Sequence, residues 1–267
     1  MGVYRNIFWI IFSVIYLLSN RGENLVVFLD VGQGDSTLIQ QGSTQILVDG
    51  GPDLSVLYGI GEYMPFGDRY IEYIYLTHPH NDHLVGILHI LKDYKVGKIF
   101  YNNVCYENPN YRALLQYGEN LVPISADHSM GFGSISIRSL WPDVNSTNLE
   151  RCKKSWDGNI NNDSIVLELS YLNKKFLLMG DAEEEVERYL TNNGSLSHRY
   201  DVLKAGHHCS KTSSSETFLK TARPHAAICS VAQQNSFGHP SGETLKTFDR
   251  MGVQYFLTYD TGNIQIK

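Results

Sequence analysis

Short apolar runs, separated by turns rich in glycine, aspartate or histidine, alternate along the chain with fewer segments of helical pattern. β-Branched and aromatic residues dominate the short runs, which is typical of strands. The pattern predicts strands at residues 24–30, 36–41, 44–48, 71–76, 96–101, 134–140, 165–169, 176–179, 200–204, 225–231, 253–258 and 263–266. It predicts helices at 54–64, 84–91, 111–117 and 182–190, and two more that begin near 216 and 241. No repeat of about 20–50 residues is evident, but the order of elements fits two similar β-rich halves.

The densest group of chemically reactive side chains follows the predicted strand 71–76. His78, His80, Asp82 and His83 lie within six residues. Pro79 disfavours a helix through this segment, so these side chains are predicted to lie on a loop at the strand's end. Neutral imidazole and carboxylate are groups that bind zinc and similar ions. The cluster therefore indicates a metal site, and a polar surface loop without function is the alternative.

Two further aspartates come directly after predicted strands. Asp49, with two glycines behind it, can reach back to brace the metal loop, or it can simply end a strand in a turn. Asp181 can bridge two cations beside the histidines, or cap the helix predicted to begin at residue 182. We favour bridging, because a carboxylate that bridges two metals has little freedom left to cap a helix.

Composition sets limits on function. The chain has 267 residues, is 42% hydrophobic and carries a net charge of −6, which is ordinary for a globular protein. The negative charge argues against a strongly basic nucleic-acid binder. It does not exclude binding of phosphate, because two divalent ions would add about four positive charges at the site.

The N-terminus differs from the rest of the chain. Residues 7–18 form an uncharged apolar run of twelve after Arg5, shorter than the roughly 20 residues of a spanning helix. The run fits a signal peptide better, but Ser19 to Gly22 shows no clear cleavage site, so an uncleaved membrane anchor is also open. A buried N-terminal helix or strand is the third alternative. The first two predict a leader at 1–23, a hydrolase domain at 24–267, and a location outside the cytoplasm.

The four cysteines show no C-x-x-C spacing, so a structural zinc cluster is not supported. Export would permit disulfides, and Cys105 and Cys152 lie in polar segments where they could pair. Cys152 belongs to a long polar segment, residues 141–162, that is functional or mobile if it forms a loop. Its basic residues favour a solvated loop over a binding patch.

Several motifs, in this order, resemble the metallo-β-lactamase fold superfamily, and more closely the soluble metal-hydrolase domain of ComEC competence (DNA-uptake) proteins. The His78–His83 cluster is similar to the HxHxDH signature. The resemblance covers about residues 24–267 and rests also on the motifs at 28–35, 47–51, 179–181, 203–210 and 235–240. It implies an α/β (α+β) fold, a four-layer αββα sandwich, with the turn at 31–35 at the edge of the active site.

The resemblance also implies a set of metal ligands. It places His78 and His80 on one divalent ion, Asp82, His83 and His207 on a second, and Asp181 between the two. Asp49 would support the ligands from behind. Zinc and manganese both fit nitrogen and oxygen ligands. Further metal or substrate contacts are open for Asn161, Asp163, His208, Ser210 and Asn235.

The chain departs from the superfamily pattern at two places. Many members have a histidine where Asn161 to Asp163 stand, so the first ion has Asp163, Asn161 or water as its third ligand. ComEC-type sequences usually have glycine where Cys209 stands. That thiol could be a ligand, a redox switch or a bystander, and we favour the bystander.

The implied function is a dinuclear phosphodiesterase or nuclease that acts on DNA through a metal-bound hydroxide, which Asp82 would help to orient. His239 is predicted to contact the scissile phosphate or protonate the leaving oxygen, with Asn235 orienting the imidazole or touching a phosphate oxygen. The alternatives are a β-lactam-hydrolysing enzyme and a degenerate metal-binding module without catalysis. A membrane tether through the N-terminus is open, and no protein partner is predicted.

Overall fold

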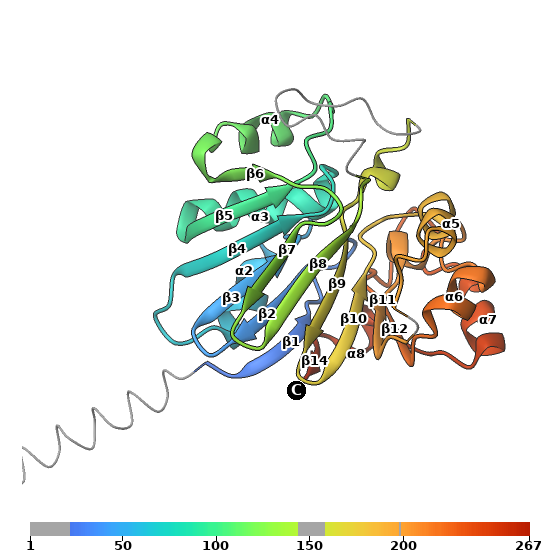
Figure 1. The fold of residues 1–267 in the computed structure, drawn as a ribbon. Helices are drawn as coiled ribbons and strands as arrows, with labels where there is room; N and C mark the ends of the chain where they lie inside the picture. The colour runs from blue at the N-terminus through green and yellow to red at the C-terminus, as the bar shows by residue number, and fades with distance from the viewer. Residues whose placement is uncertain (1–21, 144–157, 198) are drawn as a thin grey trace, which may run out of the picture.

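The computed structural model describes residues 22–143, 158–197 and 199–267. Two seven-stranded sheets face each other, and helices cover the outer face of each sheet (Figure 1). The predicted four-layer αββα sandwich is confirmed.

The first sheet and its helices come mostly from the N-terminal half. The strand order is β14-β1-β2-β3-β4-β5-β6. Its strands are β1 (Asn24–Phe28), β2 (Thr37–Gln41), β3 (Thr44–Val48), β4 (Tyr70–Leu76), β5 (Lys95–Tyr101), β6 (Leu121–Pro123) and β14 (Ile264–Ile266). The helical segments of this half are α2 (Ser55–Tyr63), α3 (Asn81–Asp93), α4 (Pro109–Leu115) and the 3-10 turn η1 (Gly118–Asn120).

The second sheet repeats this plan with the order β13-β12-β11-β10-β9-β8-β7. Its strands are β7 (Ser129–Phe132), β8 (Ile135–Trp141), β9 (Val166–Tyr171), β10 (Lys174–Leu178), β11 (Val202–Lys204), β12 (Ala226–Cys229) and β13 (Gln254–Leu257). The helices are α5 (Glu184–Asn192), α6 (Glu216–Ala222), α7 (Gly242–Met251) and α8 (Thr258–Thr261), with 3-10 turns η3 (Ile160–Asp163) and η4 (Gly206–Cys209).

Each sheet consists of an antiparallel part followed by a parallel part. In the first sheet β1 to β3 are antiparallel, and β3 to β6 are parallel. In the second, β7 to β10 are antiparallel and β10 to β13 parallel. The carboxyl ends of parallel strands meet at one edge of a sheet, which is where ligands bind in open sheets of this kind.

The apolar side chains form three layers of core. One lies between the sheets and includes Phe28, Tyr75 and Phe176. The other two lie between each sheet and its own helices, and they include Ile87 for the first sheet and Phe218 for the second. Because three apolar layers need four layers of backbone, this burial pattern produces the sandwich.

The structure corrects some predicted elements. Helix α3 begins at Asn81 with His80 as its N-cap, so the prediction that Asp82 and His83 lie on a loop is wrong. Pro79 excludes a helix only up to its own position, and the chain turns helical directly behind it. Strands β6 and β7 were missed, because β6 has only three residues and β7 is mostly exposed and shows no alternation.

Two predicted regions lie partly outside the described residues. Residues 1–21 of the predicted leader and residues 144–157 of the polar segment 141–162 are not among them. In the described part of the chain, no helix has the length and apolarity needed to cross a membrane.

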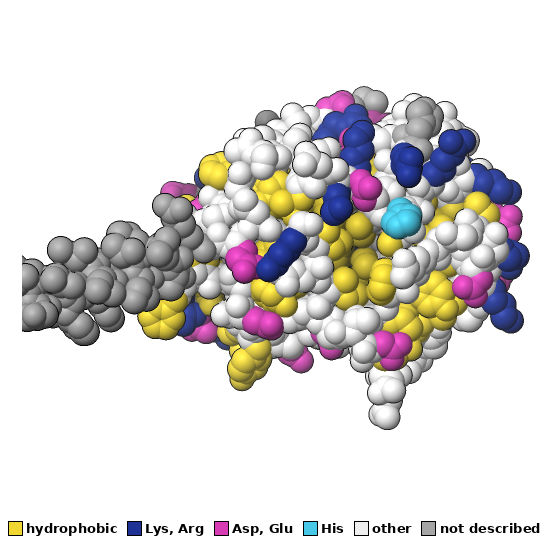
Figure 2. Space-filling model, turned by 90° about the horizontal axis from the view of Figure 1, so that it is seen from below, with side chains coloured by type: hydrophobic (Ala, Val, Ile, Leu, Met, Phe, Trp, Pro, Cys, Tyr) yellow, Lys and Arg dark blue, Asp and Glu magenta, His cyan; other side chains and the backbone are white. Residues whose placement is uncertain are grey.

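Figure 2 shows one face of the molecule. Apolar side chains show between charged ones, and lysine and arginine are most frequent toward the side that carries α6 and α7. The basic side chains are therefore not spread evenly over this face.

Candidate metal centre

The polar residues singled out in the sequence converge where strands of both sheets end. Strand β4 leads into His78 and His80, and the first turn of α3 supplies Asp82 and His83. From the facing sheet, β10 leads to Asp181 and β11 leads into η4, which carries His207 and His208.

Four side chains form a group whose ligand atoms all lie within 4.8 Å of one another: Asp82, His83, Asp181 and His208. Nε2 of His208 lies 3.2 Å from Oδ2 of Asp82 and 3.4 Å from Oδ2 of Asp181. Nε2 of His83 lies 3.3 Å from the other oxygen of Asp181. Imidazole nitrogens and carboxylate oxygens thus face one another across a space suited to a cation.

His78 and His80 form a second pair beside this group. Nε2 of His78 lies 3.0 Å from Nδ1 of His80 and 3.8 Å from Oδ2 of Asp181. Asp181 is the residue that both sets share. Helix α5 begins at Glu184 with Glu183 as its N-cap, so Asp181 does not cap it.

Asp49 braces the segment from behind. Its carboxylate accepts hydrogen bonds from the backbone N–H of Thr77 (2.8 Å), the hydroxyl of Thr77 (2.8 Å) and Nδ1 of His83 (2.8 Å). Since Nδ1 of His83 then carries a proton, Nε2 is the nitrogen that is left to bind a cation.

The turn at residues 31–35 presses against α3. A Cβ on Gly34 would come within 2.3 Å of the carbonyl oxygen of Asp82, and Gly34 has a φ of +149°. The backbone N–H of Asp35 donates to that same carbonyl (3.1 Å). Only glycine allows this approach, which puts Asp35 beside the metal ligands.

His208 is held by groups on two other segments. Its Nδ1 donates to the carbonyl of Ser230 (2.9 Å) and lies 3.3 Å from Oδ1 of Asp35. Asp35 forms a buried ion pair with Lys204, and Lys204 also donates to the carbonyl of Gly180 (3.2 Å). These contacts direct Nε2 of His208 at the carboxylates.

The structure places His207 outside the four-residue group. Its Nδ1 lies 2.9 Å from Oε1 of Glu183, and its ring centroid lies 5.1 Å from that of His239. The side-chain nitrogen of Asn161 donates to the same oxygen of Glu183 (3.1 Å). His208, the alternative that the sequence left open, lies in the four-residue group instead.

The loop that carries His239 is closed by Asn235. Its side-chain oxygen accepts from the N–H groups of Phe237 and His239, and its nitrogen donates to the carbonyls of Ala232 and His239. The amide is therefore engaged with the backbone. The loop presents Phe237, which is 66% exposed and stacks on His239 at 6.0 Å between centroids.

Two other candidates lie in supporting positions. The hydroxyl of Ser210 pairs with that of Thr212 (3.0 Å). Asp163 is fully buried, and its carbonyl accepts from Asn102 (2.6 Å).

Burial and charge perturb the titration of the group. Burial lowers the pKa of His83, but the carboxylates of Asp181, Asp49 and Asp82 outweigh burial and raise it well above the usual value. Burial also lowers the pKa of His208, but the carboxylates of Asp181 and Asp35 outweigh burial and raise it well above the usual value. In the absence of an ion, protonated imidazoles balance the charge of the ionised carboxylates, and a metal can take the place of those protons.

The residues fit a bound cation. Nε2 of His83 and Oδ1 of Asp181, both buried, have no hydrogen-bond partner within residues 22–143, 158–197 and 199–267, although they face each other. A lone pair opposite a carboxylate oxygen is costly when buried unless a proton or a metal lies between them. The donor set of histidine and aspartate suits divalent ions.

Comparison with known proteins defines the class. The model of the metallo-beta-lactamase superfamily matches residues 29–150. The metallo-beta-lactamase fold protein YhfI from Bacillus subtilis superposes with a TM-score of 0.59 at 13% identity, covering 91% of this chain and 100% of that one. The chain therefore has the metallo-β-lactamase fold, and the resemblance predicted from the sequence is confirmed.

Competence protein ComA of Neisseria gonorrhoeae is among the relatives, 25% identical over 246 residues, 92% of this chain and 32% of that protein. ComE operon protein 3 of Bacillus subtilis is 27% identical over 274 residues, 94% of this chain and 33% of that protein. Recombination protein 2 of Haemophilus influenzae is 29% identical over 247 residues, 89% of this chain and 28% of that protein. The chain thus spans a third or less of these relatives.

Sequence reasoning missed three side chains that organise the site: Asp35, Lys204 and Glu183. Asp35 ends a glycine-rich turn, and Lys204 ends a buried strand, which is a rare place for lysine. Glu183 gave no signal of its own, because it is one of several glutamates in the segment before and within α5.

Proposed function

We propose that this domain is a metal-dependent phosphodiesterase that hydrolyses DNA with two divalent ions, zinc or manganese. The observation that carries the proposal is the convergence of His78, His80 and the group Asp82, His83, Asp181 and His208 from both sheets. Two ions in such a site would supply an activated water and hold a substrate oxygen.

Each side chain has a role in this proposal. Asp82, His83 and His208 hold one ion, and His78 and His80 hold the other. Asp181 lies between the two sets, with one oxygen toward His83 and the other toward His78 and His208. For the third ligand of the ion at His78 and His80, Asn161 and Asp163 stay candidates.

The rim of the site offers groups for a substrate. His207, oriented by Glu183, and His239 lie together at the edge of the metal group. Either imidazole can donate a hydrogen bond to a phosphate oxygen. The exposed ring of Phe237 offers a surface on which a base of a single strand can stack.

Two relatives support DNA as the substrate, since one is named a recombination protein and another a competence protein. We further propose that the domain lies outside the cytoplasm. The disulfide between Cys209 and Cys229 supports this location, because disulfides persist in oxidising compartments. A reporter fused after Glu23 should then be active only outside the cytoplasm, and an active cytoplasmic fusion would overturn the location.

The function is tested with a panel of substrates and added Mn²⁺ or Zn²⁺. The panel compares single- and double-stranded DNA, RNA, bis-p-nitrophenyl phosphate and nitrocefin, with and without chelator. We expect metal-dependent cleavage of DNA and of the small phosphodiester, both lost in Asp181→Asn. Hydrolysis of nitrocefin alone would instead identify a β-lactamase, and absence of bound metal would identify a module without catalysis.

A further inference from the structure

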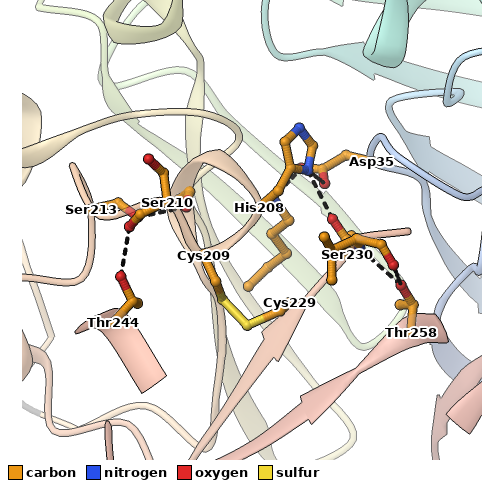
Figure 3. The surroundings of a disulfide bond; sticks show 12 residues. Asp35, His208, Cys209, Ser210, Ser213, Cys229, Ser230, Thr244 and Thr258 are labelled. Carbon is orange, nitrogen blue, oxygen red and sulfur yellow. Dashed lines mark hydrogen bonds and ion pairs between the residues drawn. A yellow bond between two sulfur atoms is a disulfide. The ribbon is translucent and has the colours of Figure 1, made fainter. Parts of the chain in front are cut away.

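The disulfide lies directly behind the candidate metal ligand His208. Cys209 follows His208 in the chain, and Cys229 precedes Ser230, whose carbonyl accepts the hydrogen bond from His208. Both cysteines are fully buried. Figure 3 shows the sulfur–sulfur bond beneath this hydrogen bond, so that one covalent link joins the donor segment to the acceptor segment. The thiol of Cys209 is thus not available as a ligand.

The backbone that carries His208 needs restraint. His207, His208 and Cys209 have φ values of +46°, +52° and +61°. Three consecutive residues other than glycine in the left-handed region are disfavoured by contacts of the Cβ atoms. Such a conformation persists only when its surroundings determine it.

Hydrogen bonds hold each of the two segments separately. On one side, the carbonyl of Ser210 accepts from the hydroxyl of Thr244 (2.8 Å). On the other, the hydroxyl of Thr258 accepts from the N–H of Val231 (2.9 Å), next to Ser230. The two segments follow the paired strands β11 and β12, and beyond that pairing the His208–Ser230 hydrogen bond and the disulfide connect them (Figure 3).

We propose that the Cys209–Cys229 disulfide is a positioning element that keeps Nδ1 of His208 on the carbonyl of Ser230 and so directs Nε2 at the metal. This rests on the proposed function, because it gives the disulfide a role in that site. The ion held by Asp82, His83 and His208 depends on the disulfide, whereas the ion held by His78 and His80 does not. Reduction by a dithiol transfers two electrons and two protons and leaves the dithiol as its own disulfide. It selectively weakens binding of the ion at Asp82, His83 and His208.

The experiment isolates this one bond. Cys105 and Cys152 are replaced by alanine in every sample, so that only Cys209 and Cys229 can be oxidised. Three proteins are compared: the oxidised protein, the same protein purified reduced, and Cys209→Ala/Cys229→Ala. Reduced and oxidised samples have the same sequence and differ only in the state of Cys209 and Cys229, which thiol alkylation with mass spectrometry verifies.

Zinc affinity is measured by competition with a chromophoric chelator. Loss of the disulfide should lower the affinity for one of the two zinc ions by about 10–100-fold, the usual effect of removing a group that orients a ligand. Equal affinities in the three proteins would overturn the proposal.

A double-mutant cycle separates positioning from general stability. In a His208→Ala background, loss of the disulfide should no longer change zinc affinity, because the group through which it acts is absent. A loss that persists in that background shows a merely structural role and overturns the proposal.

A measurement on the metal-free protein keeps the test independent of the proposed function. The ¹⁵N and ¹H resonances of His208 report whether Nδ1–H remains hydrogen-bonded to Ser230. We expect this signal to be lost without the disulfide. If the oxidised protein binds no zinc, the function fails but this measurement still decides the positioning role, and an unchanged signal overturns it.

Discussion

Replacing Asp49 by asparagine should both destabilise the fold and weaken the metal site. The carboxylate is 1% exposed and accepts three hydrogen bonds, two from Thr77 and one from His83. An amide has one acceptor oxygen, so its NH₂ group must face at least one of these donors. Hydrogen bonds to charged groups contribute about 1.5–3 kcal/mol each, and a buried donor left without an acceptor costs about 1–3 kcal/mol. Asp49→Asn should therefore lower the free energy of unfolding by about 2–4 kcal/mol.

The effect on metal follows from the same contact. Without the carboxylate, His83 loses the acceptor that fixes its tautomer and ring orientation, so zinc affinity should fall by about 10–100-fold. Urea denaturation at neutral pH measures the first effect, and competition with a chelator measures the second. Asp53→Asn is the matched control, because that exposed side chain accepts a hydrogen bond from the N–H of Ser55, and the amide oxygen of asparagine can accept the same bond. Asp49→Asn with the stability and zinc affinity of the control would refute the reasoning.

Four further outcomes follow. Asp82→Asn should keep the fold, since the residue is partly exposed at the start of α3, and should lower hydrolysis by about 100-fold or more; near-normal turnover would remove Asp82 from the mechanism. His239→Ala should retain both metals but lose activity on DNA. A smaller loss of activity on a p-nitrophenyl ester would indicate that His239 donates a proton, whereas equal losses would indicate that it binds phosphate. Loss of metal would make His239 a ligand. Phe237→Ala should weaken binding of single-stranded DNA while leaving bis-p-nitrophenyl phosphate turnover unchanged, and Phe237→Trp should restore binding. Burial raises the pKa of Glu187 to about 7, although hydrogen bonds from the backbone N–H groups of Ser215 and Ser214 lower it. The free energy of unfolding should therefore fall as pH rises from about 4.5 to 7, because the unfolded chain releases this proton at lower pH than the folded protein does. Glu187→Gln should then lose less stability than the wild type over this range in urea denaturation, and parallel pH profiles would contradict the shift.

The sequence by itself determined most of the strands and helices and the ligand types. Apolar runs of strand length, separated by polar turns, predicted two similar β-rich halves, because such strands are stable only when their faces are buried. The four-layer sandwich was implied by the family resemblance of the motifs. The cluster at His78 to His83 and the aspartates at the ends of β3 and β10 were visible as chemistry without coordinates, since metal-binding groups are costly to crowd together otherwise. In both cases local sequence limits the choices before packing begins.

Only the tertiary structure decided which of two adjacent histidines faces the carboxylates. His207 and His208 are equivalent in the sequence, and the choice between them depends on left-handed backbone at η4, on the carbonyl of Ser230, and on Asp35 from the opposite sheet. The pairing of Cys209 with Cys229 likewise needs β11 and β12 side by side. Contacts between segments distant in the chain depend on the relative placement of whole elements, which no local pattern of residues specifies.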